Sequence, residues 1–101
     1  MKTEHIVEEL KQAARQLGLR VRIDNGNFRG GRCKVGDEEM IVLNKRHLPE
    51  AHLRILAESL RELPAETVFL RPAVREALEA AWRRQDERGV EAGAEAVDVD
   101  D

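Results

Sequence analysis

The spacing of apolar residues over the first 24 positions is the feature that most constrains the fold. Between residues 3 and 17, apolar side chains recur at intervals of three and four, which gathers them on one face of a helix. From residue 19 to residue 24 the interval drops to two, as in a half-buried strand. The change falls at Gly18, and glycine is favoured where a helix ends in a left-handed conformation. The chain therefore begins with a helix, for which Thr3 is a candidate N-cap, followed by a strand.

The Asn25-Gly26 pair that follows this strand predicts a β-hairpin. Both central residues of a type I′ turn need a positive φ angle, and this pair supplies it best. A two-residue loop at this point places Arg22 directly opposite Arg29 on the next strand. We therefore expect the first two strands to be antiparallel neighbours.

The glycine pair in "NFRGGRCKVG" (residues 27–36) is interpreted as a bend in the second strand. The hairpin turns Phe28 towards the core, but Cys33 and Val35 have the opposite parity. The register must therefore shift by one residue between them. A β-bulge produces such a shift, and glycine tolerates its backbone angles. We predict that Gly30 and Gly31 form this structural bulge and that Cys33 is a small buried residue.

The second half of the chain alternates between helices and strands. The segment "EEMIVLN" (38–44) is apolar at every position from Met40 to Leu43, which predicts a central strand covered on both faces. A helix is predicted from Pro49 to about Leu63, because proline fits the first helical turn. The segment "TVFL" (67–70) predicts a short strand, and a last helix is expected from Pro72 to about Arg88.

These elements predict a single α+β domain with the order α-β-β-β-α-β-α. We expect an antiparallel sheet of three or four strands packed with three helices over residues 1–88. The last thirteen residues, 89–101, hold five acidic side chains and no basic one, and we expect them to form a disordered acidic tail. Removing the tail leaves 17 basic and 15 acidic residues, so the domain itself is slightly basic.

Composition excludes several classes of protein. No apolar run reaches the roughly 20 residues that a membrane span needs. The first ten residues contain acids within their apolar stretch, unlike a signal peptide. The single cysteine excludes an intramolecular disulfide and a four-cysteine zinc site. We therefore expect a cytoplasmic protein without a membrane partner.

Three catalytic or ligand-binding interpretations receive little support. A phosphate-binding loop lies between a strand and a helix, whereas "RGGRCKVG" is followed by another strand. Cys33 has basic neighbours that could activate a thiol, but strand alternation points it away from Arg32 and Lys34. His47 and His52 lack the i, i+4 spacing of a zinc-binding helix, and His5 lies far away in the sequence. We expect no catalytic residue, no metal and no cofactor.

Basic side chains on the predicted hairpin form the one candidate binding surface. The expected anion-binding or nucleic-acid-binding face consists of Arg20, Arg22, Arg29, Arg32 and Lys34. Like charges directly opposite each other on two strands repel unless an anion lies between them. A nucleic-acid phosphate could be that anion, and so could Asp24, Glu38 or the acidic tail. The absence of interleaved aromatic residues weakens the nucleic-acid interpretation.

One longer resemblance covers residues 13–61. The segments "AARQLGLRVR" and "MIVLNKRHLPEAHLRILAESL", joined by a glycine-containing hairpin, resemble the front half of the ImmA/IrrE-type zinc metallopeptidases. The alignment places Ala57 and Arg61 at the two histidines of the family's His-Glu-x-x-His motif, and only Glu58 matches it. Without two imidazoles on one helical face a zinc ion has no anchor. The resemblance therefore implies a degenerate relative without peptidase activity.

The sequence thus predicts a non-catalytic binding or regulatory domain. We expect it to act through a protein partner or through homodimerisation, because a sheet edge can recruit another chain and a small domain gains by burying more apolar surface. Nucleic-acid binding through the basic sheet face is the alternative function.

Overall fold

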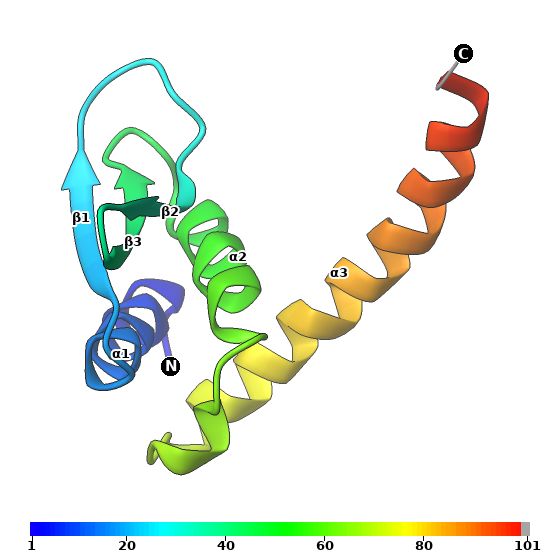
Figure 1. The fold of residues 1–101 in the computed structure, drawn as a ribbon. Coiled ribbons are helices and arrows are strands. Elements are labelled where there is room, and N and C mark those ends of the chain that lie inside the picture. Colours follow the sequence, from blue (N-terminus) through cyan, green and yellow to red (C-terminus); the bar gives the residue numbers. More distant parts are fainter. Residues whose placement is uncertain (100–101) are drawn as a thin grey trace.

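The computed structural model describes the backbone of residues 1–99 and the side chains of residues 1–89 (Figure 1). In chain order its elements are α1 (Thr3–Gln16), β1 (Arg20–Asp24), β2 (Gly31–Val35), β3 (Glu38–Asn44), α2 (Pro49–Leu60), the 3-10 helix η1 (Ala65–Thr67) and α3 (Pro72–Val99). The sheet packs against α1 and α2, and α3 packs against these two helices (Figure 1). The predicted α+β class is confirmed, with three strands.

The helix α1 ends as the apolar spacing predicts. At its C-terminus the N–H of Leu19 donates to the carbonyl of Ala14 at 3.0 Å, and the N–H of Gly18 donates to the carbonyl of Arg15 at 3.0 Å. These two bonds define a Schellman motif. Gly18 has a φ angle of 94°, which glycine adopts at little cost, so its predicted role is confirmed.

The central strand of the sheet is β3, and the strand order is β1-β3-β2. The strands β2 and β3 are antiparallel, as predicted, but β1 runs parallel to β3. The predicted hairpin at Asn25-Gly26 is therefore wrong, because β3 lies between β1 and β2. The physical reason is the composition of β3: it is the most apolar strand, and the middle of the sheet buries it best.

Residues 25–30 carry the chain past the carboxyl end of β3 to reach β2 (Figure 1). Asn44, which is only 2% exposed, holds this crossing segment in place. Its Nδ2 donates to the carbonyls of Gly26 at 3.0 Å and Phe28 at 2.7 Å, and its Oδ1 accepts from the N–H of Arg46 at 3.0 Å. The side chain of Asn44 thus provides hydrogen bonds to the crossing segment, where a tight turn would have had backbone hydrogen bonds.

The glycine pair has positive φ angles, but it does not form the predicted bulge. Gly30 has a φ angle of 85° and Gly31 one of 142°. A Cβ atom at Gly30 would lie 2.7 Å from the carbonyl oxygen of Val42, so the crossing segment approaches β3 too closely for any side chain. Gly31 begins β2 opposite Val42. A bulge between β1 and β2 cannot exist, since these strands are not paired.

The hydrophobic core lies between one face of the sheet and the helices. Ile41 and Leu43 of β3 are fully buried in it, together with Leu56 and Leu60 of α2. No helix in the described part of the chain packs on the second face of β3, so the prediction that both faces are covered is wrong. No helix among the described residues 1–99 has both the length and the apolar character of a membrane span.

The segment predicted as a fourth strand is not one. Residues 65–67 form η1, and residues 68–71 belong to neither a helix nor a strand. The alternation survives, because Val68 and Leu70 are buried while Phe69 is 84% exposed. Alternating apolar and polar residues indicate that one side of a segment is buried. A loop that lies along the core can show this pattern as well as a strand.

The helix α3 is longer than predicted. Its described contacts with α2 include the indole Nε1 of Trp82, which donates to the carbonyl of Ala57 at 2.8 Å. The backbone remains helical through Val99, so the predicted end near Arg88 is wrong. Alanine and glutamate, both strong helix formers, make up five of the seven residues from Val90 to Ala96. The division into a domain over 1–88 and a disordered tail over 89–101 stays a prediction, and residues 100 and 101 lie outside the described chain.

Candidate functional site

The face of the sheet that points away from the helices is the candidate site. Because Ile41 and Leu43 point into the core, Met40 and Val42 point to the other side. The strand register then assigns neighbours to them: Arg20 and Cys33 flank Met40, and Arg22 and Gly31 flank Val42. We call this surface the open face. Its side chains are those of Arg20, Arg22, Cys33, Val35, Glu38, Met40 and Val42.

The arginines of the open face have carboxylate partners within the chain. Arg20 Nη1 lies 2.8 Å from Glu38 Oε2, and Arg22 Nη2 lies 3.4 Å from Asp24 Oδ1. These are two of the alternatives that the sequence left open for neutralising the basic strand. The pairs are exposed, so each contributes little to stability, but they leave the open face with balanced charge.

Apolar side chains occupy the middle and one end of the open face. Met40 is only 8% exposed because its neighbours on β1 and β2 surround it, whereas Val35 is 60% exposed. A shallow hollow of about 510 Å³ borders this surface beside β1, lined by Arg15, Leu19 and Arg20 among others. Exposed apolar area framed by paired charges is the composition of a contact surface for another protein.

The predicted basic face is not assembled. Arg20 and Arg22 lie on the open face, but the register places Arg32 and Lys34 on the side of the sheet that α2 covers. Arg29 lies in the crossing segment, so it does not oppose Arg22. The expectation of one shared face for the five side chains is wrong. It depended on the β1–β2 hairpin, which the central position of β3 excludes.

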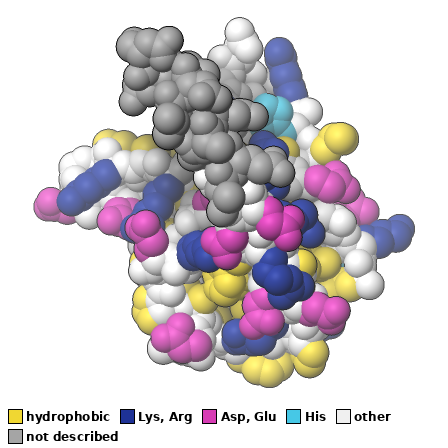
Figure 2. Space-filling model, turned by 90° about the vertical axis from the view of Figure 1, so that its right-hand side faces the viewer, with side chains coloured by type: hydrophobic (Ala, Val, Ile, Leu, Met, Phe, Trp, Pro, Cys, Tyr) yellow, Lys and Arg dark blue, Asp and Glu magenta, His cyan; other side chains and the backbone are white. Residues whose placement is uncertain are grey.

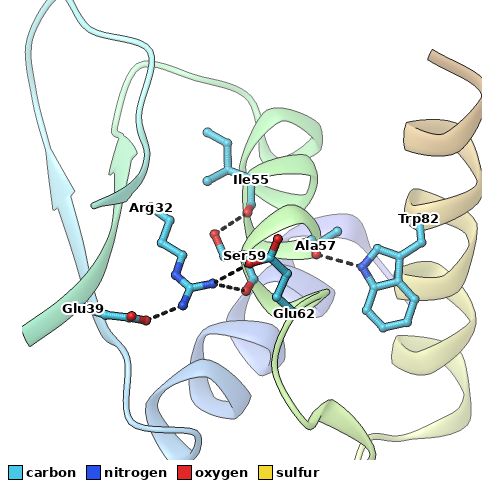
Figure 3. Close-up of polar contacts among 7 residues, drawn as sticks. All are labelled: Arg32, Glu39, Ile55, Ala57, Ser59, Glu62 and Trp82. Atoms are coloured by element: carbon cyan, nitrogen blue, oxygen red, sulfur yellow. Dashed lines mark hydrogen bonds and ion pairs between the residues drawn. The ribbon is translucent and has the colours of Figure 1, made fainter. Parts of the chain in front are cut away.

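Arg32 serves instead as a link between β2 and α2 (Figure 3). Its Nη1 donates to the carbonyl of Ser59 at 3.4 Å and lies 3.9 Å from Glu62 Oε2, and its Nη2 pairs with Glu39. The hydroxyl of Ser59 in turn donates to the carbonyl of Ile55 at 2.8 Å (Figure 3). A guanidinium with several acceptors around it has little capacity left for an external anion.

Cys33 is exposed on the open face, so the prediction that it is buried is wrong. As expected from strand alternation, the side chain of Cys33 lies on the other side of β2 from those of Arg32 and Lys34. The error concerned which side of the strand faces the core: Arg32 occupies the helix-covered side because carboxylates meet it there. Its two basic sequence neighbours therefore point away from the thiol.

The histidines do not come together. His52 Nε2 lies 2.7 Å from the carbonyl oxygen of Asn44, His47 lies in the loop before α2, and His5 is on α1. Among the described residues, no group of three or more His, Cys, Asp or Glu side chains is placed to hold a metal ion. The expectation that the protein needs no metal stays a prediction.

The metallopeptidase resemblance aligns Ala57 and Arg61 with the zinc-binding histidines, and in this structure both residues contact α3. Ala57 is fully buried, and its carbonyl accepts the indole N–H of Trp82 (Figure 3). Arg61 Nη2 lies 2.7 Å from Asp86 Oδ1. This hydrogen bond lowers the pKa of the Asp86 carboxyl below its ordinary value and raises the pKa of Arg61. Glu58 points into solvent.

No protein-family model, curated protein or solved structure matches the chain. The resemblance to the ImmA/IrrE-type metallopeptidases therefore stays a prediction.

Met40 and Val42 are the site residues that sequence reasoning missed. A run of four apolar residues hides strand parity, because both faces look alike. The sequence of β1 contained a signal, because Arg20 and Arg22 alternate with apolar residues. A strand next to β3 with arginines on one face indicates that no helix covers that face of the sheet.

Proposed function

We propose that this protein is a non-catalytic binding module that acts through protein–protein contact, with a second copy of the chain as its partner. The observation that supports this function is the open face, a sheet surface that no described helix covers and that presents the exposed Val35 and the half-buried Val42. We place the protein in the cytoplasm and assign it no cofactor.

Charge balance favours a second copy over a partner of opposite charge. Arg20 pairs with Glu38, and Arg22 pairs with Asp24. The open face therefore has no excess of either charge that a partner of opposite charge would neutralise. A surface of this kind is compatible with itself, as the two-fold symmetry of a homodimer requires. On the side of the molecule that bears α3, basic and acidic side chains are interspersed as well (Figure 2).

The size of the open face sets the expected strength of the dimer. Three strands with usual spacing and rise cover about 300 Å², against about 800 Å² per partner in a standard stable interface. The open face can therefore form only the centre of the contact. We expect a weak, concentration-dependent dimer with micromolar or weaker affinity.

Light scattering over a range of protein concentrations tests this proposal. We expect the mean mass to rise towards that of a dimer, and Val35→Lys to suppress the rise by placing an unpaired charge in the contact. Phe69→Lys is the matched control, because Phe69 is 84% exposed but lies in the loop before α3. A chain that stays monomeric at millimolar concentration, or one in which only Phe69→Lys prevents association, would contradict the proposal.

Nucleic-acid binding is the alternative function. It is the weaker one, because Arg20 and Arg22 lie on one side of the sheet, Arg32 and Lys34 on the other, and Arg29 outside the strands. A salt titration with DNA and RNA distinguishes the two. Phosphate contacts predict affinity that falls steeply with salt, whereas the proposed module should not bind nucleic acid at physiological salt.

A further inference from the structure

Three arginines gather around a cavity of about 340 Å³ that lies between the three helices. Arg54 comes from the second turn of α2, and Arg84 and Arg88 come from neighbouring turns of α3. The apolar part of the lining is Leu53 and Ala81, which are buried. The cavity is therefore a small hollow with an apolar base and guanidinium groups around it.

Among the side chains of residues 1–89, the three arginines around this cavity outnumber the carboxylates that line it, since Glu50 is the single acidic residue of the lining. Arg84 and Arg88 are four residues apart on one helix face, where like charges repel. None of the three arginines forms an ion pair with a carboxylate among residues 1–89, although Glu50 lines the same cavity. Elsewhere the fold does provide such partners, for Arg20, Arg22, Arg32, Arg61 and Arg71.

Two helices also begin at this cavity. Thr3, the first residue of α1, and Glu50, in the first turn of α2, both contribute to the lining. Neither helix has a side-chain cap: the N-cap residues are Lys2, in place of the predicted Thr3, and Leu48. The positive ends of two helix dipoles thus add to the charge of the three arginines.

We propose that this cavity binds the phosphate groups of a small polyanion, with diphosphate as the minimal ligand. Guanidinium groups bind phosphate oxygens in a bidentate manner, and a dianionic or trianionic ligand between Arg54 and the Arg84–Arg88 pair relieves their repulsion. The volume suits a small molecule, since it lies at the lower end of ligand-binding pockets.

Isothermal titration calorimetry of the full chain with sodium pyrophosphate at low ionic strength tests this inference. We expect saturable binding at one site. The double variant Arg84→Gln/Arg88→Gln should weaken it at least about tenfold, and Arg54→Gln should weaken it from the opposite wall. All three side chains are exposed, so these variants are expected to fold, which circular dichroism verifies.

The double variant Arg75→Gln/Arg83→Gln is the matched control. It removes two positive charges from the same helix at positions that do not line the cavity, and it should change the affinity by less than about threefold. An equal loss in both double variants would show that only net charge matters and would overturn the inference. Absence of saturable pyrophosphate binding at millimolar concentration would overturn it as well.

Two further titrations identify the source of the phosphate groups. If ADP binds more tightly than pyrophosphate, the cavity selects a nucleotide; if the two bind equally, diphosphate itself suffices. Orthophosphate should bind more weakly than either, because it carries less charge and fewer oxygen atoms for the three guanidinium groups. This inference is independent of the proposed dimer, since the cavity lies among the helices and the open face lies across the sheet.

Discussion

Gly30 and Gly36 both have positive φ angles, but their surroundings differ in a way that single substitutions can separate. At Gly36, with a φ angle of 63°, no atom beyond its two chain neighbours lies within 4 Å of the position that a Cβ would take. At Gly30, with a φ angle of 85°, a Cβ would lie 2.7 Å from the carbonyl oxygen of Val42 and 3.3 Å from Ile55 Cδ1. Gly30 therefore combines a conformational requirement with a steric one.

We expect Gly36→Ala to lower the free energy of unfolding by about 1 kcal/mol, the cost of a left-handed alanine. Gly30→Ala should lower it by more than about 2 kcal/mol, because the crossing segment must also move away from β3. Urea unfolding of the two variants measures the difference. Equal losses would show that the crossing segment does not press on β3.

The packing of α3 onto α2 depends on a small set of polar contacts around Trp82. Its indole donates to the carbonyl of Ala57, and Arg61 pairs with Asp86 one turn further along α3. Arg61 Nη1 also donates to the carbonyl of Trp82 at 3.3 Å. Since Trp82 is the only tryptophan of the chain, its fluorescence reports whether the two helices are docked.

The Arg61–Asp86 pair predicts a specific pH dependence. The hydrogen bond from Arg61 lowers the pKa of Asp86 in the folded state, so folding favours the ionised carboxyl. The stabilisation is complete above the unfolded pKa of about 3.9 and is lost as the pH falls through the lower folded value. The pair is exposed to solvent, so the effect is small.

Urea midpoints of the wild type and of Asp86→Asn, followed by Trp82 fluorescence, measure this effect. We expect the wild type to be the more stable at pH 6 and the difference to shrink as the pH falls through about 4 towards 2. Glu87→Gln is the control, because Glu87 is exposed and forms no ion pair with the residues up to Gly89. A difference that does not vary with pH would rule out ionisation as its cause.

For the molecule as a whole, the question is how much of α3 belongs to the folded unit. The buried side chains of α3 within the described range are Val74, Leu78 and Ala81, and the polar contacts with α2 end at Asp86. The domain predicted from the sequence therefore contains the described core contacts of this helix.

A chain that ends at Arg88 should keep the unfolding free energy of the full chain to within about 0.5 kcal/mol. A chain that ends at Ala80 is the control: it lacks Ala81 and Trp82 and should lose several kcal/mol. Urea unfolding followed by circular dichroism compares the three chains. A large loss already in the longer truncation would show that residues 89–101 contribute to the fold.

Local chemistry determined where the helices begin and where α1 ends. The apolar spacing of α1, the glycine at its end and the prolines that open α2 and α3 act over a few residues, so their effect can be read from the sequence. The apolar run of β3 likewise indicated its central position. The end of α3 was not predictable in this way, because two glycines but no proline follow Arg88, and the helix continues past both glycines.

Tertiary structure decided the strand neighbours and, with them, the candidate site. The alternation of side chains along a strand shows which residues share a face. It does not show which face the helices cover or which strand is the neighbour in the sheet. Arg22 and Arg29 were expected to be opposite each other, but Arg29 lies in the segment that crosses the end of β3. Arg32 and Cys33 were assigned to the wrong sides for the same reason. The arginine cavity joins Arg54 to residues thirty positions later, and only the docking of α3 on α2 brings them together.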